Sequence, residues 1–213
     1  DLPSGRGYNA FWVDPGTRFT SVKGEMRTSW ITKPLNGRIP YSDEGNQLRR
    51  EGRAKFSGYA GPEGAPLAER CLIGFGSTSG PPMNSVLYNN MYQIVQTDDY
   101  VMILVEMVHD ARIIRIGSGP RLPPHIRPWF GDSWGRWEGD ALVVETTNIN
   151  PRQEFSSNVG ATLGGAQDPH PSEQTRVTER LTRVDEETIL YEFTVEDPTV
   201  YSESWGGQIP MTA

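Results

Sequence analysis

The sequence predicts an all-β protein, an antiparallel meander closed into a lipocalin-like barrel of about eight strands. Three observations lead to this fold class. Runs in which apolar and polar residues alternate recur from residue 86 onward, short turn-forming segments separate these runs, and only one segment has the pattern of a helix start. Consecutive hairpins of this kind build an antiparallel sheet rather than a parallel one. A β-sandwich is the alternative architecture.

The 213 residues are enough to bury a sizeable core, and we expect a single domain over 1–213. Residues 1–85 are expected to form a long N-terminal arm, at most one short helix and a long Gly/Pro-rich loop, all wrapping the body. The body, residues 86–213, is the barrel. The helix is expected to begin near Ser42, because a serine followed by acidic residues is a capping pattern.

The strands are expected where the alternation is clearest and turn residues follow. One of them differs from the others, because residues 101–105 are apolar at every position. A strand that is apolar on both faces is normally covered on both sides, so we expect something to pack outside the sheet here. The expected strands are 25–33, 91–97, 100–108, 112–116, 133–138, 141–147, 175–184, 189–195 and 201–209.

Composition narrows the class of partner. The formal net charge of -7 and the pI of about 5.0 argue against nucleic acid or an anionic membrane. No apolar run is long enough to cross a membrane, so no membrane insertion is expected. A single cysteine, Cys71, excludes an internal disulfide framework and a multi-thiolate metal site. The chain begins abruptly at Asp1, and we expect this start to be either a trimmed or a mature terminus.

Residues 129–140 are the most unusual stretch, with four aromatic residues, three glycines and three carboxylates. A turn at Glu138-Gly139-Asp140 makes this stretch the first arm of a central hairpin. Its tryptophans, with two tyrosines elsewhere, are candidates to line a pocket for an apolar or aromatic ligand. The same rings serve equally well as core, which is the commoner role of a tryptophan in a barrel. The candidate ligand-binding residues are Trp129, Trp134, Trp137, Tyr92 and Tyr191.

The candidate catalytic residues begin just after the apolar strand 101–105. His109 is the expected general base, and Arg112 is expected to stabilise an oxyanion or enolate. Asp132 or Glu179 would supply the acid or the orienting carboxylate. Glu179 shares a strand face with Val177, and if that face is internal its carboxylate needs a partner, for which Arg112 or His109 is the natural choice. The alternative is a histidine at a hairpin corner beside surface ion pairs.

No cofactor and no metal are expected. The three histidines, His109, His125 and His170, are not at ligand spacing in the sequence. A centre assembled in space from histidines and carboxylates stays open as an alternative. The glycines over 74–80 are similar to a phosphate loop, but the lysine that such a loop requires does not follow.

Residues 131–144 resemble the signature of a large family of exported bacterial proteins of unassigned function. Members read G-D-S-x-G-x-W-E-G-D-T-L-V-V, and among the fixed positions only Ala141 departs here. The resemblance implies a periplasmic or secreted location with the signal peptide removed, and it transfers no reaction. A histidine that many members carry before the Val-x-Glu-Arg strand is absent from 174–177. Further matching segments are 8–12, 37–40, 69–72, 109–112, 178–180, 191–195 and 197–198.

Three hypotheses for function follow. The first is an exported small-molecule enzyme of lyase, isomerase or hydratase type, using acid–base chemistry without a cofactor on an apolar or aromatic substrate held in the barrel. The second is a lipocalin-like carrier of a small apolar ligand, without catalysis. The third is an interaction or structural protein with a filled interior. Convergence of the four candidate catalytic residues on one cavity favours the enzyme, and a purely apolar cavity favours the carrier. A homo-oligomer is compatible with each.

Overall fold

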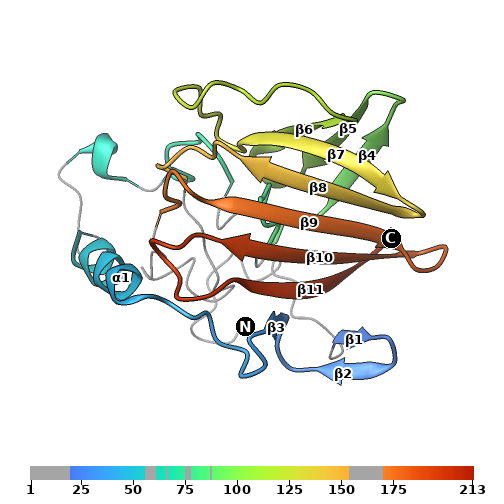
Figure 1. The fold of residues 1–213 in the computed structure, drawn as a ribbon, viewed down its shortest axis with the longest axis horizontal. Helices are drawn as coiled ribbons and strands as arrows, with labels where there is room; N and C mark the ends of the chain where they lie inside the picture. Colours follow the sequence, from blue (N-terminus) through green and yellow to red (C-terminus); the bar gives the residue numbers. More distant parts are fainter. Residues whose placement is uncertain (1–19, 56–60, 66, 75–77, 87, 154–169) are drawn as a thin grey trace, which may run out of the picture.

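The structure, a computed structural model, describes residues 20–55, 61–65, 67–74, 78–86, 88–153 and 170–213. The expected N-terminal arm lies outside the described residues almost entirely. The described chain is mostly β-strand with one α-helix, which confirms the all-β class (Figure 1). In chain order the elements are β1 (Thr20–Val22), β2 (Glu25–Arg27), β3 (Ile31–Lys33), α1 (Asp43–Lys55), β4 (Tyr92–Gln96), β5 (Tyr100–Val105), β6 (Ala111–Ile116), β7 (Asp132–Glu138), β8 (Ala141–Thr147), β9 (Arg176–Arg183), β10 (Thr188–Glu196) and β11 (Trp205–Thr212), with short 3₁₀ turns at Pro62–Gly64 and Met107–His109.

One nine-stranded sheet organises the molecule. Its strand order is β3-β11-β10-β9-β8-β7-β6-β5-β4, and β1 and β2 form a separate hairpin. The expected antiparallel meander is present in two parts of the sheet, one from β4 to β6 and the other from β7 to β11. The join between these two parts differs, because β6 and β7 pair in parallel. A parallel neighbour needs a long connection that returns the chain to its starting end, and the proline-rich segment 117–131 provides it.

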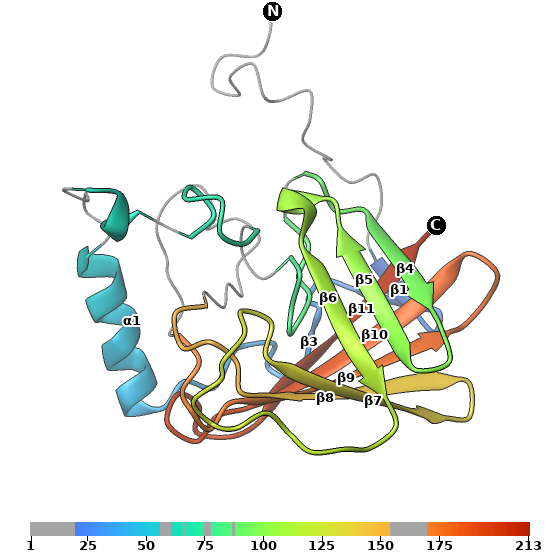
Figure 2. The same ribbon diagram turned by 90° about the horizontal axis from the view of Figure 1, so that it is seen from above.

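The sheet is strongly bent. Figure 2 shows β4, β5 and β6 rising steeply from the layer that β7 to β10 form. Side chains from both parts meet in one apolar core on the inner, concave face; its fully buried members include Ile103, Ile114, Val144 and Val177. Within the described residues the sheet ends at β3 on one side and at β4 on the other, and these two edges do not pair. The observed form is therefore a curled open sheet, and a closed lipocalin-like barrel is not found among the described residues.

The all-apolar strand β5 is buried on one face only. Val101, Ile103 and Val105 point inward and are fully buried, whereas Met102 and Leu104 point outward and are half-buried. The expectation that something covers the outer face is not met within the described residues, because Ile113, the neighbour of Met102 on β6, is 52% exposed. Of the helices in the described part of the chain, none has the length and apolarity needed to cross a membrane.

The first expected strand is two strands in the structure. β2 pairs back on β1, whereas β3 joins β11 in the main sheet. Between them the Ser29 hydroxyl accepts a hydrogen bond from the backbone N–H of Ile31 at 3.2 Å, which forms a local turn that alternation alone did not reveal. The expected last strand, 201–209, is shifted toward the C-terminus and covers 205–212.

The helix begins where the capping pattern predicted. The Ser42 hydroxyl accepts a hydrogen bond from the backbone N–H of Gly45 at 2.9 Å, and the helix starts at the next residue, Asp43. The backbone N–H of Ser42 in turn donates to the carbonyl of Val200 at 3.0 Å. Gly45 faces this carbonyl so closely that a Cβ atom there would lie 2.1 Å from its oxygen. The helix therefore contacts the segment before β11 backbone to backbone.

This contact reverses the usual effect of an alanine in a helix. Helix propensity alone predicts that Gly45→Ala stabilises the protein by about 1 kcal/mol. We expect instead a loss of about 1–3 kcal/mol in the free energy of unfolding, because the new methyl group forces α1 away from Val200. Urea unfolding measures the sign. The matched control Gln47→Ala, at an exposed position of the same helix, should change stability by less than about 0.5 kcal/mol, and a stabilised Gly45→Ala would contradict the contact.

Candidate functional site

A buried ion pair stands at the centre of the inner face. Arg112 points inward from β6, two residues before the core residue Ile114, and is only 2% exposed. Its guanidinium meets the carboxylate of Glu179 on β9 with two nitrogens, one of them Nη1 at 2.8 Å from Oε1. Nη2, the second of these, also donates to the hydroxyl of Thr146 at 2.9 Å. An internal Glu179 was expected to pair with Arg112 or His109, and the structure pairs it with Arg112.

Hydroxyl groups from three more strands complete this buried cluster. The phenol of Tyr191 on β10 donates to Glu179 Oε1 at 2.8 Å and accepts the backbone N–H of Met83 at 2.8 Å. The hydroxyls of Ser133 on β7 and Thr146 on β8 lie 2.8 Å apart. The polar cluster, defined as Arg112, Glu179, Tyr191, Ser133 and Thr146, therefore spans five consecutive strands. Through Met83 it also holds the loop that crosses the inner face.

The pKa values of Arg112 and Tyr191 are both raised in this cluster. Burial by itself lowers the pKa of Arg112, but the charge of Glu179 and the hydrogen bonds to it outweigh burial, so the pKa is raised. Burial, and then the charge of Glu179, raise the pKa of Tyr191 well above its ordinary value. An efficient general acid or base has a pKa near the working pH. Arg112 and Tyr191 thus serve as fixed hydrogen-bond donors rather than as proton-transfer groups.

His109 does not join the polar cluster. It lies in the 3₁₀ turn after β5 with a left-handed backbone (φ 57°), and its side chain is exposed. Its neighbour Asp110 accepts hydrogen bonds from the Ser79 hydroxyl at 2.8 Å and from the backbone N–H of Gly74 at 2.7 Å. The turn therefore positions Asp110 to hold Gly74 and Ser79, while His109 points to solvent. Among the described hydrogen bonds none involves the His109 imidazole.

Asp132 lies on the opposite face of the sheet from Arg112. Successive side chains of β7 alternate, and Ser133 is the one that points inward. The Asp132 carboxylate forms an ion pair with Arg115 and accepts the backbone N–H of Leu122 at 2.8 Å. Arg115 also lies over the ring of Trp134, 4.2 Å from its centroid. Asp132 and Trp134 thus fasten the long connection 117–131 to the outer face.

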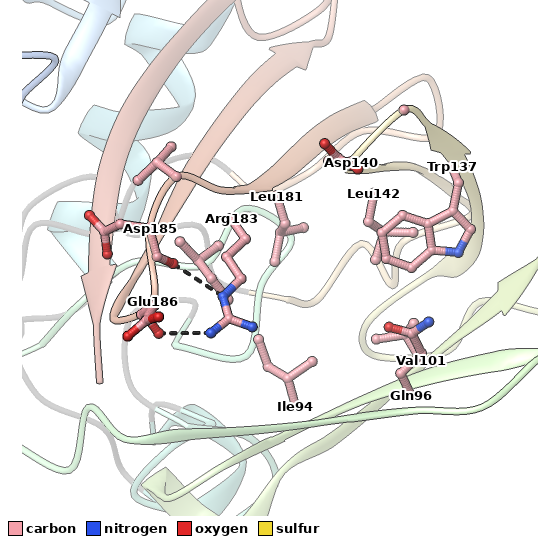
Figure 3. A pocket seen from close by; sticks show the side chains of 13 residues that line it. Ile94, Gln96, Val101, Trp137, Asp140, Leu142, Leu181, Arg183, Asp185 and Glu186 are labelled. Atoms are coloured by element: carbon pink, nitrogen blue, oxygen red, sulfur yellow. Dashed lines mark hydrogen bonds between the residues drawn. The ribbon is translucent and has the colours of Figure 1, made fainter.

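The structure holds a pocket at one end of the inner face. It measures about 880 Å³ and opens beside three hairpin turns, which follow β4, β7 and β9 (Figure 3). Leu181, one inward position along β9 from Glu179, marks the boundary between the pocket and the polar cluster. Apolar side chains form its walls, namely Ile94, Val101, Trp137, Leu142, Leu181 and Ile189. Polar residues stand at its mouth and include Gln96, Asp140, Arg183, Asp185 and Glu186.

Arg183 is the only basic residue among those that line the pocket. Its Nε and Nη2 donate to the backbone carbonyls of Asp185 at 3.1 Å and Glu186 at 2.9 Å. These two bonds direct the guanidinium toward Ile94 on the facing wall (Figure 3). The sequence contained the signal for this position, because Glu179, Leu181 and Arg183 follow one another at period two and share a face.

Of the predicted ligand-binding rings, one lines the pocket. Trp137 is the inward residue at the end of β7 and contributes a wall. Tyr191 belongs to the polar cluster instead, and the Tyr92 hydroxyl donates to the carbonyl of Thr78 at 3.0 Å. Trp134 faces outward under Arg115, and Trp129 is half-buried in the connection before β7. Trp134 and Trp137 lie on opposite faces of β7, because they are three residues apart and side chains alternate along a strand.

Within the residues that the structure describes, no group of three or more His, Cys, Asp or Glu side chains is placed to hold a metal ion. The prediction of no metal and no cofactor stays a prediction. His125 lies exposed in the proline-rich connection, and the ring of exposed His170 has its Nδ1 3.0 Å from the carbonyl of Gln153.

Comparisons with known proteins do not assign a function. No family model, no curated protein and no solved structure matches the chain. The resemblance of residues 131–144 to a family of exported bacterial proteins therefore stays a prediction from the sequence.

The buried ion pair can be tested by a double-mutant cycle. Arg112→Met should lower the free energy of unfolding by about 3–5 kcal/mol, because it leaves Glu179 as an uncompensated buried charge. Combining it with Glu179→Leu removes both charges and should cost less than the sum of the two single changes. Urea unfolding of the four proteins gives the coupling. Glu179→Gln is the matched control, since it keeps the shape of the side chain and removes only the charge. If the losses in the free energy of unfolding from Arg112→Met and Glu179→Leu simply add in the double variant, a strong ion pair is contradicted.

We expect the free energy of unfolding to fall at alkaline pH, because two tyrosines, Tyr92 and Tyr191, have raised pKa values. Burial raises the pKa of Tyr92 to about 12, and burial, followed by the charge of Glu179, raises the pKa of Tyr191 well above its ordinary value. An unfolded tyrosine ionises near its ordinary pKa of about 10, so this stability is complete below that pH and is lost as the pH rises toward 12. Unfolding in urea at a series of pH values should show this fall, and Tyr92→Phe should make it shallower. Ionisation of both rings before unfolding, seen by tyrosinate absorbance, would count against their burial.

Proposed function

We propose that the protein binds a small, largely apolar molecule in the pocket at the turn end of its curled sheet, as a lipocalin-like carrier does. One observation carries the proposal: an opening of about 880 Å³ has walls of apolar side chains and a few polar groups at its mouth. Ligand sites in proteins are concave, measure roughly 300–1,000 Å³ and combine apolar walls with a small number of placed polar groups. The likeness to lipocalins concerns an apolar pocket on the inner face of the sheet, and it does not require the sheet to close.

The polar cluster supports the carrier over the enzyme. Chemistry on a bound molecule requires reactive groups that face the cavity, and the candidate residues do not share one. Arg112 and Glu179 are buried and engaged with each other, Asp132 lies on the other face of the sheet, and His109 is exposed. Acid–base catalysis of the lyase, isomerase or hydratase type stays a prediction from the sequence.

The lining narrows the class of ligand. Trp137 presents a broad ring that is 46% exposed, which suits an aromatic or terpenoid-like skeleton. Arg183 offers a hydrogen-bond donor at the mouth for a single polar end of the ligand. The carboxylates of Asp140, Asp185 and Glu186 surround the same opening, so a ligand with several negative charges is disfavoured. The ligand is therefore mainly apolar, with at most one acceptor group.

We further propose that the protein works outside the cytoplasm, in the periplasm or as a secreted protein. The support is the resemblance of residues 131–144 to a family of exported proteins. The structure adds a reason for these residues to occur together. Gly135 lies so close to Ile114 and Ile116 that a Cβ would approach them at 3.0 Å, and the turn at Gly139 has a left-handed backbone (φ 60°). Residues 131–144 therefore include glycines that the β7–β8 hairpin requires, and this hairpin forms one wall of the pocket.

Ligand binding can be measured with an uncharged aminoanthracene probe, whose fluorescence rises in an apolar site. The protein should bind it, and Trp137→Ala should weaken binding about tenfold, since it removes most of one wall. Ile189→Glu, which places a charge in the opposite wall, should weaken it at least as much. Arg136→Ala is the matched control, because Arg136 neighbours Trp137 but points to the other face. Equal binding by all four proteins would place the probe elsewhere and remove the proposal.

A further inference from the structure

The two edges of the main sheet differ in how they are protected. β3 is only three residues long, ends in Lys33 and is followed by Pro34, and such features prevent an edge from pairing with another strand. β4 has none of them, because residues 91–97 contain no charge, no proline and no glycine. Four of its five residues are exposed, including Ile94 at 38% and Val95 at 41%. An apolar, uncharged and exposed edge is the type that associates with another strand.

The hydrogen bonds to β5 determine which groups of β4 point outward. The N–H of Thr97 donates to the carbonyl of Tyr100 at 2.8 Å, and the N–H of Glu106 donates to the carbonyl of Met91 at 2.9 Å. Residues 91, 93, 95 and 97 therefore direct their backbone groups toward β5. The alternate residues Tyr92, Ile94 and Gln96 direct their N–H and C=O groups to the open edge. Within the described residues no strand lies beside them.

We propose that β4 pairs with β4 of a second copy of this chain, antiparallel and about a two-fold axis at Ile94. In this register Ile94 opposes its own counterpart and Tyr92 opposes Gln96, so all six outward backbone groups of each strand find partners. On the outer face Gln93 opposes Val95. The contact is isologous, the usual form for a homodimer.

Charge favours a second copy as the occupant. The paired strands bring no like charges together, because residues 91–97 are uncharged. Asp98 and Asp99 follow immediately, and the two-fold register directs them toward Asn90 and Asn89 of the other copy rather than toward each other. A strand with this distribution is complementary to itself.

The outer face provides a second reason. Val95, Met102 and Ile113 are direct neighbours across β4, β5 and β6, and they form an apolar stripe that ends at the β4 edge. Val95 and Ile113 are exposed, and Met102 is half-buried. Edge pairing joins this stripe to the same stripe of the second copy and places the two Val95 side chains on adjacent strands. This arrangement gives a role to the outward residues of an apolar strand.

The inference is tested with charges placed in the proposed register. Sedimentation velocity should show a dimer for the unaltered protein. The double variant Gln93→Lys/Val95→Lys places lysine opposite lysine twice in each dimer and should raise the dissociation constant at least about tenfold. Both positions are exposed, so circular dichroism and urea unfolding should confirm that the variant folds. Met26→Lys, at a residue 74% exposed on β2, is the matched control and should remain dimeric.

A charge exchange then tests the register itself. Gln93→Glu/Val95→Glu should also raise the dissociation constant, whereas an equal mixture of the lysine and glutamate variants should form a heterodimer more tightly than either variant pairs with itself. The reason is that each residue 93 faces residue 95 of the other copy. An unaltered protein that sediments as a monomer at every concentration overturns the proposal. A lysine variant whose dissociation constant is unchanged, or a mixture that associates no more tightly than either variant alone, overturns this interface in the same way.

Discussion

The ion pair between Arg112 and Glu179 is the interaction on which the curved sheet depends. β6 and β9 are separated by β7 and β8, and across a flat sheet that separation would be about 14 Å. Bending brings the two side chains into direct contact, and small hydroxyl residues, Ser133 and Thr146, leave room for the guanidinium to cross. Burial of two charges is costly unless they are paired and hydrogen-bonded. Here the charges are paired and both carboxylate oxygens and both Nη atoms are hydrogen-bonded, and Nε of Arg112 alone has no partner among the described residues.

The same cluster divides the interior into two parts. On one side the loop that ends at Met83 lies over it, held by Tyr191 and by Gln153, whose side-chain amide donates to the carbonyl of Gly80 at 2.8 Å. On the other side, beyond Leu181, the walls are apolar and open beside the hairpin turns. The buried polar groups are engaged in hydrogen bonds with one another, whereas the pocket at the apolar end of the inner face is accessible to a ligand.

β4 links the pocket to the edge of the sheet. Because β3 and β4 do not pair, β4 has no strand beside its outer edge within the described residues, while its inward residues Ile94 and Gln96 line the pocket. A closed barrel would have removed that edge. The open form therefore accounts for both proposals: an internal site for an apolar molecule and a strand free to pair with a second copy.

Local patterns in the sequence predicted most of the strands, the start of α1 and the set of β9 residues that share a face, because alternation and capping depend only on neighbouring residues. They also indicated that a buried Glu179 would need a partner, with Arg112 and His109 as the two candidates, and the tertiary structure selected Arg112. Only the tertiary structure decided that Asp132 and Trp134 face outward, that His109 lies in a left-handed turn, and that β6 and β7 run in parallel. These features depend on strand register, on sheet curvature and on a long connection, which arise from contacts between residues far apart in the chain. The place of the pocket belongs to this second group, since its walls come from both parts of the bent sheet.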